Sequence, residues 1–434
     1  MGTLRSVVAL QTVQPMLESE NFTLAQSSIL VVTNTNDSGP GSLRQTIADA
    51  TSGDTIKFDL SLAGKTIMLA STLIIDKDIT VDGDNLDQRV KVSGDTNSNN
   101  YGDVRIFQVT NSNNVELKGI DIVYGYVGSG TGDAGHGGGI LNYGNLTLTN
   151  CRMDGNRALR GGGIYNSIDA ILIISNCVLS NNIAEDSGGG ISNSGTLNIT
   201  NSTFVNNTAN PWGSAIYAVG MQTITNSTFY NNNISGGGGT IYHSSSGSTL
   251  SLVSENNTFN ANVEYAIYNA DGNAIINNNT IFGNIGGIYI FSDQVDISNT
   301  IVSNNFFNGD PQDCYKSNVA TIGSDNHNLF SSDKNCGVSV YGYGVSLYNL
   351  ADNGGPTQTM ALKPDSPAID AGDDATCEIT DQRGASRPQG AHCDIGAYEE
   401  YPDTTFMVKD IRPTPNIGSE PNWLTNVNGI LYFT

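Results

Sequence analysis

The stretch Asn176-Cys177-Val178-Leu179-Ser180-Asn181-Asn182 decides the fold, because the chain repeats its pattern six times between residues 150 and 284. Each copy reads Asn-x-x-h-x-x-Asn, where h is a large apolar residue, and successive copies lie about 25 residues apart. A repeat on that period is typical of a solenoid, whose units bury their apolar faces only by stacking on one another. The copies are Asn150/Met153/Asn156, Asn176/Leu179/Asn182, Asn201/Phe204/Asn207, Asn226/Phe229/Asn232, Asn256/Phe259/Asn262 and Asn278/Ile281/Asn284.

The segments between the copies indicate strands. Apolar and polar residues alternate before the first asparagine of a copy, as in Leu146-Thr147-Leu148, which is typical of a short strand with one buried face. Gly, Asn and Ser dominate the rest, and the apolar spacing never fits a helix, which excludes helical repeats. Propeller blades need about 40 residues per unit or more. The sequence therefore predicts an all-β, right-handed parallel β-helix. A further column of isoleucines marks the same coils: Ile140, Ile164, Ile191, Ile216, Ile241, Ile267 and Ile288.

Both asparagine columns are predicted to be structural. Equivalent residues of successive coils lie over one another, so asparagine side chains can pass hydrogen bonds along the axis, and asparagine also tolerates the left-handed backbone of tight corners. An alternative, in which these asparagines bind sugar or calcium, is disfavoured because regular repetition is what packing requires and a single site does not. The predicted ladder residues are Asn150, Asn176, Asn201, Asn226, Asn256, Asn278, Asn156, Asn182, Asn207, Asn232, Asn262 and Asn284.

Composition favours a secreted or cell-surface protein and excludes some partners. The chain has 434 residues, 50 of them Gly, only 14% charged residues and a net charge of −23. Without a Lys/Arg cluster to neutralise phosphates, nucleic acid is not an expected partner, and the acidity disfavours anionic membranes. No apolar run reaches the ~18 residues of a membrane-spanning helix.

Four segments are predicted along the chain. Residues 1–29 are an irregular or disordered N-terminal segment, and residues 30–305 form the β-helix with its N-terminal cap. The cap is an amphipathic helix over Ser42–Ala50, with Ser42 as N-cap, which shields the open edge of the first coil. Residues 306–400, where the period disappears, form a loop-rich extension, and residues 401–434 form a separate last segment.

The six cysteines fall into three pairs by position. Cys314 with Cys336 and Cys377 with Cys393 lie outside the repeats, and an even count in an exported chain favours disulfides for these four. Cys151 and Cys177 follow the first asparagine of adjacent repeats, so they are either small buried members of a column or a disulfide. The spacing of a zinc site is absent from the sequence.

The C-terminal motifs resemble the carboxy-terminal signature of the choice-of-anchor Q family of bacterial surface and secreted proteins. The opening Gly39–Ile47 is similar to the start of the β-helix domains that occur with it, including those like polymorphic outer-membrane proteins. The resemblance covers about residues 30 to 400 and implies a β-helix in an exported bacterial protein, without implying a reaction. The motifs are Gly354–Leu362, Ser366-Pro367-Ala368-Ile369-Asp370-Ala371-Gly372, Thr380-Asp381-Gln382-Arg383-Gly384, Arg387-Pro388 and Cys393-Asp394-Ile395-Gly396-Ala397-Tyr398-Glu399.

The last segment resembles a different repeat. Phe406–Ile411 followed by Asn422–Phe433 is similar to one incomplete copy of the ELWxxDGT repeat, which occurs in arrays in large bacterial surface proteins. The resemblance implies further domains of the same chain beyond Thr434.

An enzyme is the alternative to a purely structural protein. Pectate and alginate enzymes use this fold, and a uronan lyase needs an Arg or Lys base with a cation that neutralises the sugar carboxylate. A charge cluster on adjacent coils supplies the low-ranked catalytic candidates, although such charges usually form a solvated face. The candidates are Arg152, Asp154, Arg157 and Arg160, joined by His136.

His136 lies in Gly135-His136-Gly137, which resembles the Gly-His-Gly of polygalacturonases. Glycoside hydrolysis requires two or three carboxylates converging within roughly 5 to 10 Å. The paired aspartates and the Arg-x-Lys of those enzymes are missing around His136, and the only Asp-Asp, Asp373-Asp374, lies in the C-terminal signature. We therefore expect His136 to be a loop residue.

No cofactor is expected, and calcium is the one ion that the acidic turns suggest. Its candidate ligands are Asp82, Asp84 and Asp87, although acidic turns are usually just solvated. The favoured interpretation is a non-catalytic, secreted or cell-surface β-helix, a stalk or adhesion module whose partner is a carbohydrate or a surface protein. The alternative is a polysaccharide lyase, epimerase or hydrolase acting on an acidic glycan.

Overall fold

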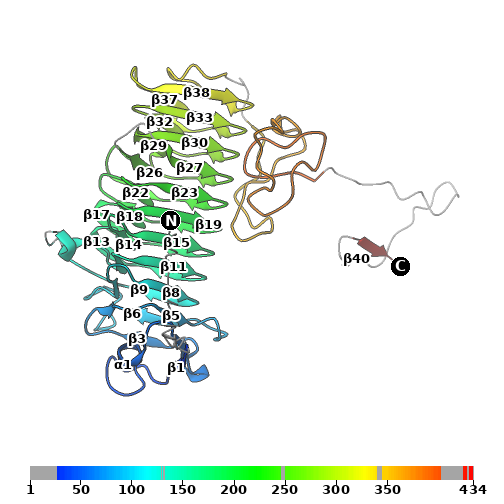
Figure 1. Cartoon of the computed structure of the whole chain (residues 1–434). Coiled ribbons are helices and arrows are strands. Elements are labelled where there is room, and N and C mark those ends of the chain that lie inside the picture. The colour runs from blue at the N-terminus through cyan, green and yellow to red at the C-terminus, as the bar shows by residue number, and fades with distance from the viewer. Residues whose placement is uncertain are drawn as a thin grey trace, which may run out of the picture.

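The protein is a right-handed parallel β-helix, seen in a computed structural model as a stack of coils (Figure 1). The structure describes residues 27–128, 130, 132–245, 250–339, 345–401, 424–427 and 430–433. Three long parallel sheets of twelve, eleven and ten strands run along the stack and are called sheets 1, 2 and 3; a four-stranded sheet 4 lies between sheets 2 and 3. Each complete coil contributes one strand to each long sheet, as the repeat pattern predicts.

The strands of sheets 1 and 2 are short and alternate buried with exposed residues. In stacking order, sheet 1 contains β1 (Ile29–Val32), β2 (Thr55–Phe58), β5 (Ile79–Asp82), β8 (Asn114–Lys118), β11 (Asn145–Thr149), β15 (Ile171–Ser175), β19 (Thr196–Thr200), β23 (Gln222–Thr225), β27 (Leu250–Glu255), β30 (Asn273–Asn277), β33 (Gln294–Ser298) and β38 (Thr321–Asn326). Sheet 2 contains β3 (Thr66–Met68), β6 (Val90–Ser93), β9 (Ile120–Val123), β12 (Arg152–Asp154), β16 (Val178–Ser180), β20 (Thr203–Val205), β24 (Thr228–Tyr230), β28 (Thr258–Asn260), β31 (Thr280–Phe282), β34 (Ile301–Ser303) and β39 (Leu329–Phe330).

Sheets 3 and 4 complete the coils. Sheet 3 contains β4 (Leu73–Ile75), β7 (Phe107–Val109), β10 (Ile140–Asn142), β14 (Ile164–Asn166), β18 (Ile191–Asn193), β22 (Ile216–Ala218), β26 (Gly239–Ser244), β29 (Tyr265–Asp271), β32 (Ile288–Ile290) and β37 (Cys314–Lys316). Sheet 4 contains β13 (Arg157–Arg160), β17 (Ile183–Ser187), β21 (Thr208–Ala209) and β25 (Asn233–Ile234). The remaining elements are α1 (Leu43–Asp49), η1 (Leu60–Leu62), η2 (Gly132–Gly135) and the antiparallel pairs β35 (Phe306–Phe307) with β36 (Asp310–Pro311) and β40 (Leu424–Val427) with β41 (Ile430–Phe433).

The core is built from columns of like apolar residues. In sheet 3, Ile164 pairs with Ile191 and Ile191 with Ile216, and all three side chains are fully buried. In sheet 2, Phe229 lies between two further phenylalanines of the same column, with ring centroids 4.9 and 4.7 Å apart. Those distances match the spacing of neighbouring strands, so each coil buries its apolar face against the next.

The second asparagine of each repeat belongs to a continuous buried ladder. Asn182 donates from Nδ2 to Oδ1 of Asn207 (2.9 Å), and the same Oδ1 also accepts the backbone N–H of Asn182 (3.1 Å). Its Nδ2 makes a second hydrogen bond to the carbonyl oxygen of Met153 (3.1 Å), so the amide is fully used. The ladder runs Asn156, Asn182, Asn207, Asn232, Asn262, Asn284 and Asn305.

The first asparagine of each repeat has a different role, which corrects the assignment of both columns to one kind of ladder. These residues hold left-handed corners with φ between 51° and 55°, a backbone region that asparagine tolerates. Their side chains have other partners: Asn150 lies 3.4 Å from Asp84, and Asn256 donates to the carbonyl oxygen of Thr380. The corner residues are Asn150, Asn176, Asn201, Asn226, Asn256 and Asn278.

Cys151 and Cys177 are free, buried members of a column. The backbone N–H of Cys151 points at the sulfur of Cys177 (3.3 Å), and that of Cys177 donates to the hydroxyl of Ser202 (3.1 Å). Ser202 then donates its own N–H to the hydroxyl of Ser227 (3.1 Å). Of the two alternatives left open by the sequence, the structure contains the small column member and not the disulfide.

The N-terminal cap is present as predicted. Ser42 caps α1 by accepting the N–H of Gln45, and Leu43 and Ile47 are buried against the first coils. At the other end, the coils continue past the predicted boundary at residue 305, because β37, β38 and β39 still pair with the preceding coil. The loop sequences after Phe306 conceal these strands, which lack the asparagine repeat.

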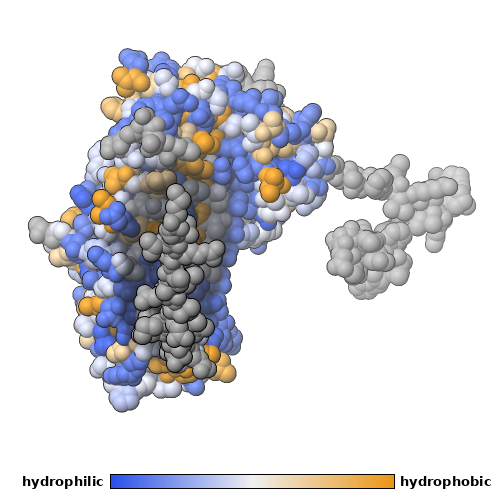
Figure 2. All heavy atoms as spheres, viewed as in Figure 1, coloured by the Kyte–Doolittle hydropathy of each residue, from blue (hydrophilic) through white to orange (hydrophobic). Residues whose placement is uncertain are grey.

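The C-terminal segment, residues 345–401, packs beside the coil stack and has a small apolar core of its own with Ile301 and Leu329 of the coils (Figure 1). Both predicted disulfides outside the repeats are present: Cys314–Cys336 closes the last coil, and Cys377–Cys393 lies within the C-terminal segment. The face of the molecule seen in Figure 2 is mostly hydrophilic, with scattered apolar residues.

The expectations for residues 1–26 and for most of residues 402–434 fall outside the described residues, and this includes most of the ELWxxDGT-like sequence. Within the described part of the chain, no helix is both long and apolar enough to cross a membrane.

Candidate functional site

The charged residues proposed as catalytic candidates are ion-paired with carboxylates. Arg152 pairs with Asp154 (2.9 Å), and both residues lie on β12. Arg157 and Arg160 lie on the following strand, β13. On β13, the two arginines pair across to the next coil. Their partners are Glu185 for Arg157 (2.8 Å) and Asp186 for Arg160 (2.6 Å).

This pairing opposes a role as catalytic base. The hydrogen bond that Arg157 donates to Glu185 raises the pKa of Arg157, and the one that Arg160 donates to Asp186 raises the pKa of Arg160. A lyase base must accept a proton from the sugar, so a guanidinium whose pKa lies above its ordinary value is a poor one. The cluster of positive charge is thus a set of ion pairs between coils.

His136 stacks on an aromatic ring and does not face a carboxylate pair. Its ring lies 4.1 Å from the ring of Tyr165, nearly parallel to it, and its pKa is lowered by burial and by the nearby Arg160. The imidazole is therefore neutral at neutral pH. Tyr165 lies on sheet 3, where its neighbour in the next coil is Ser192 and the one after that is Tyr217.

The outward face of sheet 3 carries a tyrosine on five consecutive coils. We call Tyr217, Tyr242, Tyr268, Tyr289 and Tyr315 the tyrosine stripe; each pairs in register with the next. Neighbouring ring centroids are 5.4, 5.1, 4.3 and 4.8 Å apart, with interplanar angles of 7 to 20°. The strands β22, β26, β29 and β32 that carry the first four lie one above another in the upper half of the stack (Figure 1).

The stripe presents a polar aromatic ridge to solvent. Every tyrosine in it is only partly buried. Trp212 packs against Tyr242, and Tyr265 packs edge-on against Tyr268 and Tyr289. Burial raises the pKa of Tyr217, Tyr242, Tyr268 and Tyr289. The phenols therefore stay protonated and can both donate and accept hydrogen bonds.

A hollow of about 440 Å³ lies beside the stripe, and its walls combine aromatic and polar groups. Tyr242 and Tyr268 form one wall, and Phe291, whose side chain is 50% exposed, forms part of another. Exposed aromatic residues beside convergent polar groups are typical of ligand sites. The polar part of the lining comes from Ser244, Asp271 and Ser292.

Asp271 shares this edge of the sheet with Asp293. Both carboxylates accept the N–H of Gly272, at 3.2 and 2.8 Å, and both lie within 3.3 Å of the Ser292 hydroxyl. The contact with Asp293 raises the pKa of Asp271, while hydrogen bonds from Gly272 and Asp271 lower the pKa of Asp293. Two carboxyl groups in direct contact are too close for the pair used by glycosidases, which needs roughly 5 Å or more.

A larger hollow, of about 640 Å³, crosses sheet 1 near Glu116, Thr147 and Ile173. Its described lining contains no aromatic side chain. This hollow therefore has no aromatic ring on which a sugar could stack. Its polar groups are mainly side chains on the surface of the sheet. The tyrosine stripe with its hollow is therefore the stronger candidate site.

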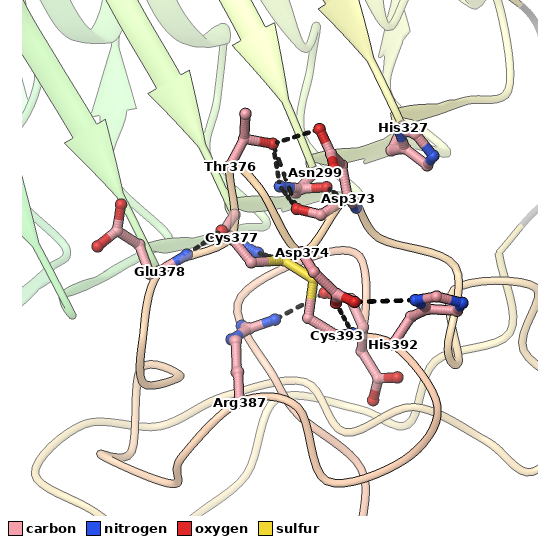
Figure 3. The surroundings of a disulfide bond; sticks show 12 residues. Asn299, His327, Asp373, Asp374, Thr376, Cys377, Glu378, Arg387, His392 and Cys393 are labelled. Atoms are coloured by element: carbon pink, nitrogen blue, oxygen red, sulfur yellow. Dashed lines mark hydrogen bonds and ion pairs between the residues drawn. A yellow bond between two sulfur atoms is a disulfide. The ribbon is translucent and has the colours of Figure 1, made fainter.

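The Asp-Asp pair of the C-terminal signature joins that segment to the coils (Figure 3). Asp373 receives the side-chain N–H of Asn326 and gives its own N–H to Asn299, whereas Asp374 pairs with His392 (2.9 Å). Hydrogen bonds lower the pKa of both aspartates, so neither is the protonated acid that glycoside hydrolysis requires.

Other signature residues form a buried network between the C-terminal segment and sheet 2. Gln382 accepts from Thr258 (2.6 Å) and donates to Thr228 (2.9 Å), two outward threonines of neighbouring coils. Arg387 pairs with Glu399 (3.3 Å), and both side chains are almost completely buried. The residues that carry the family resemblance thus fasten this segment to the coil stack.

The calcium candidates are engaged with the protein. Asp82 pairs with Lys57 (2.8 Å) and lies 3.8 Å from Lys118, and Asp84 lies beside Asn150. Asp87 is exposed at the surface. Over the described ranges, no group of three or more His, Cys, Asp or Glu side chains is gathered around a common point where a metal ion would fit.

Comparison with known proteins finds similarity in fold only. No protein family matches the sequence, and no curated protein matches it. Among solved structures, the pectate lyase Pel9A is similar with a TM-score of 0.42 and 14% identity, over 86% of this chain and 96% of that one. A PL6 alginate lyase in complex with a trisaccharide is similar with a TM-score of 0.39 and 11% identity, over 83% of this chain and 95% of that one. Likeness at this level does not extend to activity.

The tyrosine stripe was missed by sequence reasoning, although the sequence contains its signal. The isoleucine column was recognised, but the residue after each isoleucine was not compared between coils. Because neighbours in a strand point to opposite faces, a buried isoleucine column implies an exposed column one residue later. The Ile-Tyr pairs at 216–217, 241–242, 267–268 and 288–289 spell out that column.

Proposed function

We propose that this protein is a non-catalytic, exported β-helix that binds carbohydrate along the tyrosine stripe. The observation that carries the proposal is the uninterrupted outward tyrosine column, which has a hollow with an exposed Phe291 beside it. Sugars combine apolar C–H faces with many hydroxyls, and a row of aromatic edges and phenol groups complements both.

The periodicity of the stripe favours a polymer over a single sugar. Each coil repeats the same aromatic edge at the strand spacing of ~4.8 Å, so a glycan chain lying along the axis meets equivalent groups at successive units. Weak contacts at each coil then add up, as in other multivalent interactions. A single monosaccharide would use only one such step.

Export is supported by two disulfides, because disulfides persist in oxidising compartments. The resemblance of the C-terminal motifs to choice-of-anchor Q proteins supports a secreted or cell-surface location. On this proposal the coil stack serves as a rigid stalk and binding face. The alternative, catalysis on an acidic glycan, finds no unpaired arginine within the proposed catalytic cluster.

The test is a glycan array followed by calorimetric titration of the best oligosaccharide into four variants. Phe291→Ala and Tyr268→Ala should each weaken binding at least fivefold to tenfold, or about 1 to 1.4 kcal/mol, as truncation of an interface aromatic does. Tyr230→Ala is the matched control, because Tyr230 is 38% exposed on sheet 2. Tyr268→Phe retains the ring and isolates the contribution of the hydroxyl.

Three outcomes would contradict the proposal. The array could show no glycan binding, Tyr230→Ala could weaken binding as much as Phe291→Ala, or the protein could cleave the glycan. If a protein bound to the stripe instead, the partner would be a surface protein and not a carbohydrate.

A further inference from the structure

Two carboxylates lie at the hollow beside the tyrosine stripe, and their negative charge restricts the glycan that this part of the stripe can bind. The inference rests on the proposed function. The whole chain has a net charge of −23. Asp271 and Asp293 form no ion pair within the described part of the chain, and Arg160, near Tyr217, is neutralised by Asp186. The positive groups at the other end of the stripe are Lys316 and Lys334, which lie beside Tyr315; Lys334 pairs with Asp310 (3.6 Å).

The two carboxylates are poised for a cation. The two carboxylates share the Gly272 N–H and the Ser292 hydroxyl as hydrogen-bond donors. They therefore have more acceptor sites than there are donors to fill them. Two carboxylates in contact cannot both ionise without a proton or a positive charge between them. A positively charged ligand group at this edge of the hollow would allow both carboxylates to be ionised.

The aromatic walls select the kind of cation. Tyr242, Tyr268 and Phe291 surround the hollow that Asp271 lines, and aromatic rings attract ammonium groups carried on an organic body. A bare metal ion needs several oxygen ligands, and the described residues gather no group of three acidic or other ligating side chains here. An ammonium group on a sugar ring uses the carboxylates and the rings together.

We propose that the hollow binds the protonated amine of an amino-sugar unit, so the ligand of the stripe is a cationic polymer of amino sugars. Amines recurring along such a polymer also meet the general negative charge of the protein, which steers a polycation toward the surface and repels a polyuronate. The amine at the hollow fixes the register of the chain, and the neighbouring units lie along the tyrosines.

The test compares three hexasaccharides by calorimetry: one of glucosamine, one of N-acetylglucosamine and one of galacturonate. The glucosamine oligomer should bind at least tenfold more tightly than its neutral acetylated counterpart, and its affinity should fall with added salt. The galacturonate oligomer should not bind measurably. Asp271→Asn combined with Asp293→Asn should bring the affinity for glucosamine down to that of the acetylated oligomer.

Asp296→Asn is the matched control, because Asp296 lies on the outward face of sheet 1, where its carboxylate accepts a hydrogen bond from the side chain of Gln294. It should leave the affinity for the glucosamine oligomer unchanged. Equal affinities of the two amino-sugar oligomers, or unchanged binding in the double variant, would overturn the inference while leaving carbohydrate binding intact. A requirement for added calcium would overturn it as well. Binding of none of the oligosaccharides, together with an empty glycan array, would instead refute the proposed function.

Discussion

Two asparagine columns that look alike in the sequence do different work. The second asparagine of each repeat is buried and bonded to its equivalents above and below, whereas the first holds a left-handed corner. The side chains at the two positions point in different directions, because three strand residues and a corner lie between them. The spacing alone did not reveal which column faces inward.

Removing one member of the ladder should be costly. Asn207→Ala leaves the N–H and Nδ2 of Asn182 and the carbonyl oxygen of Leu179 without their partner, and each unsatisfied buried group costs about 1 to 3 kcal/mol. We expect the free energy of unfolding to fall by about 2 to 4 kcal/mol in denaturant titration. Asn198→Ala, at an exposed position of β19, is the control and should change it by less than ~0.5 kcal/mol. Equal effects of the two changes would argue against the ladder.

The cysteine column gives a second test at the residue scale. Cys151 and Cys177 are free and buried, while the other four cysteines form disulfides. Without reductant, a thiol reagent should find two reactive thiols in the denatured chain and almost none in the folded one. Burial raises the pKa of Cys151, which further slows reaction in the folded state. The absence of free thiols after denaturation would mean that the two are bonded.

At the scale of elements, the sequence predicts what repeats and misses what does not. The coils, the capping helix over Ser42–Ala50 and the two outer disulfides follow from period, capping residue and cysteine position. The sequence does not predict the strands β37 to β39, because they lack the repeated asparagines. The sequence does not predict the partners of the signature residues either. Gln382, for example, donates a hydrogen bond to Thr228, which lies 154 residues earlier in the chain. Contacts of that kind have no local trace in a sequence.

The stability of the C-terminal segment should depend on pH. Burial raises the pKa of Asp394 from 3.8 to about 7, so the folded state holds a proton that the unfolded chain releases near pH 4. A raised carboxyl pKa means that this contribution to stability is greatest at low pH and is lost as the pH rises through about 7. Glu399 has its pKa raised by burial too and acts in the same direction.

Hydrogen exchange of residues 345–401 measures this contribution locally. The segment should exchange faster relative to the coils at about pH 8 than at about pH 5, after correction for the intrinsic rates. Asp394→Asn should make that difference smaller, whatever its effect on absolute stability. A pH dependence that persists unchanged in the variant would show that another group is responsible.

At the scale of the whole molecule, the coil stack is a rigid rod whose faces differ in chemistry. Sheet 3 carries the tyrosines, sheet 2 is partly covered by the C-terminal segment, and the ion-paired Arg157 and Arg160 lie on sheet 4. The candidate site that the sequence suggested, around Arg157, lies near one end of the aromatic column that the structure revealed. His136 stacks on Tyr165, which Ser192 separates from the first tyrosine of the stripe in the register of sheet 3.

The same distribution of charge predicts no eliminative cleavage of acidic glycans. With −23 net charge and the arginines of the proposed cluster held by carboxylates, polygalacturonate and alginate should neither bind nor yield unsaturated uronides, with or without calcium. Ultraviolet absorbance during prolonged incubation checks this. Product that disappears in Arg157→Ala, but not in the surface variant Asn198→Ala, would establish the enzyme in place of the binding module.

The position of a bound glycan tests the central claim most directly. A crystal structure of the chain with the oligosaccharide that binds most tightly in calorimetry should show sugar units along Tyr242, Tyr268 and Tyr289, with Phe291 in contact with one of them. Sugar bound on another face, for example beside Arg157 and Glu185, with the tyrosine stripe bare, would contradict the account.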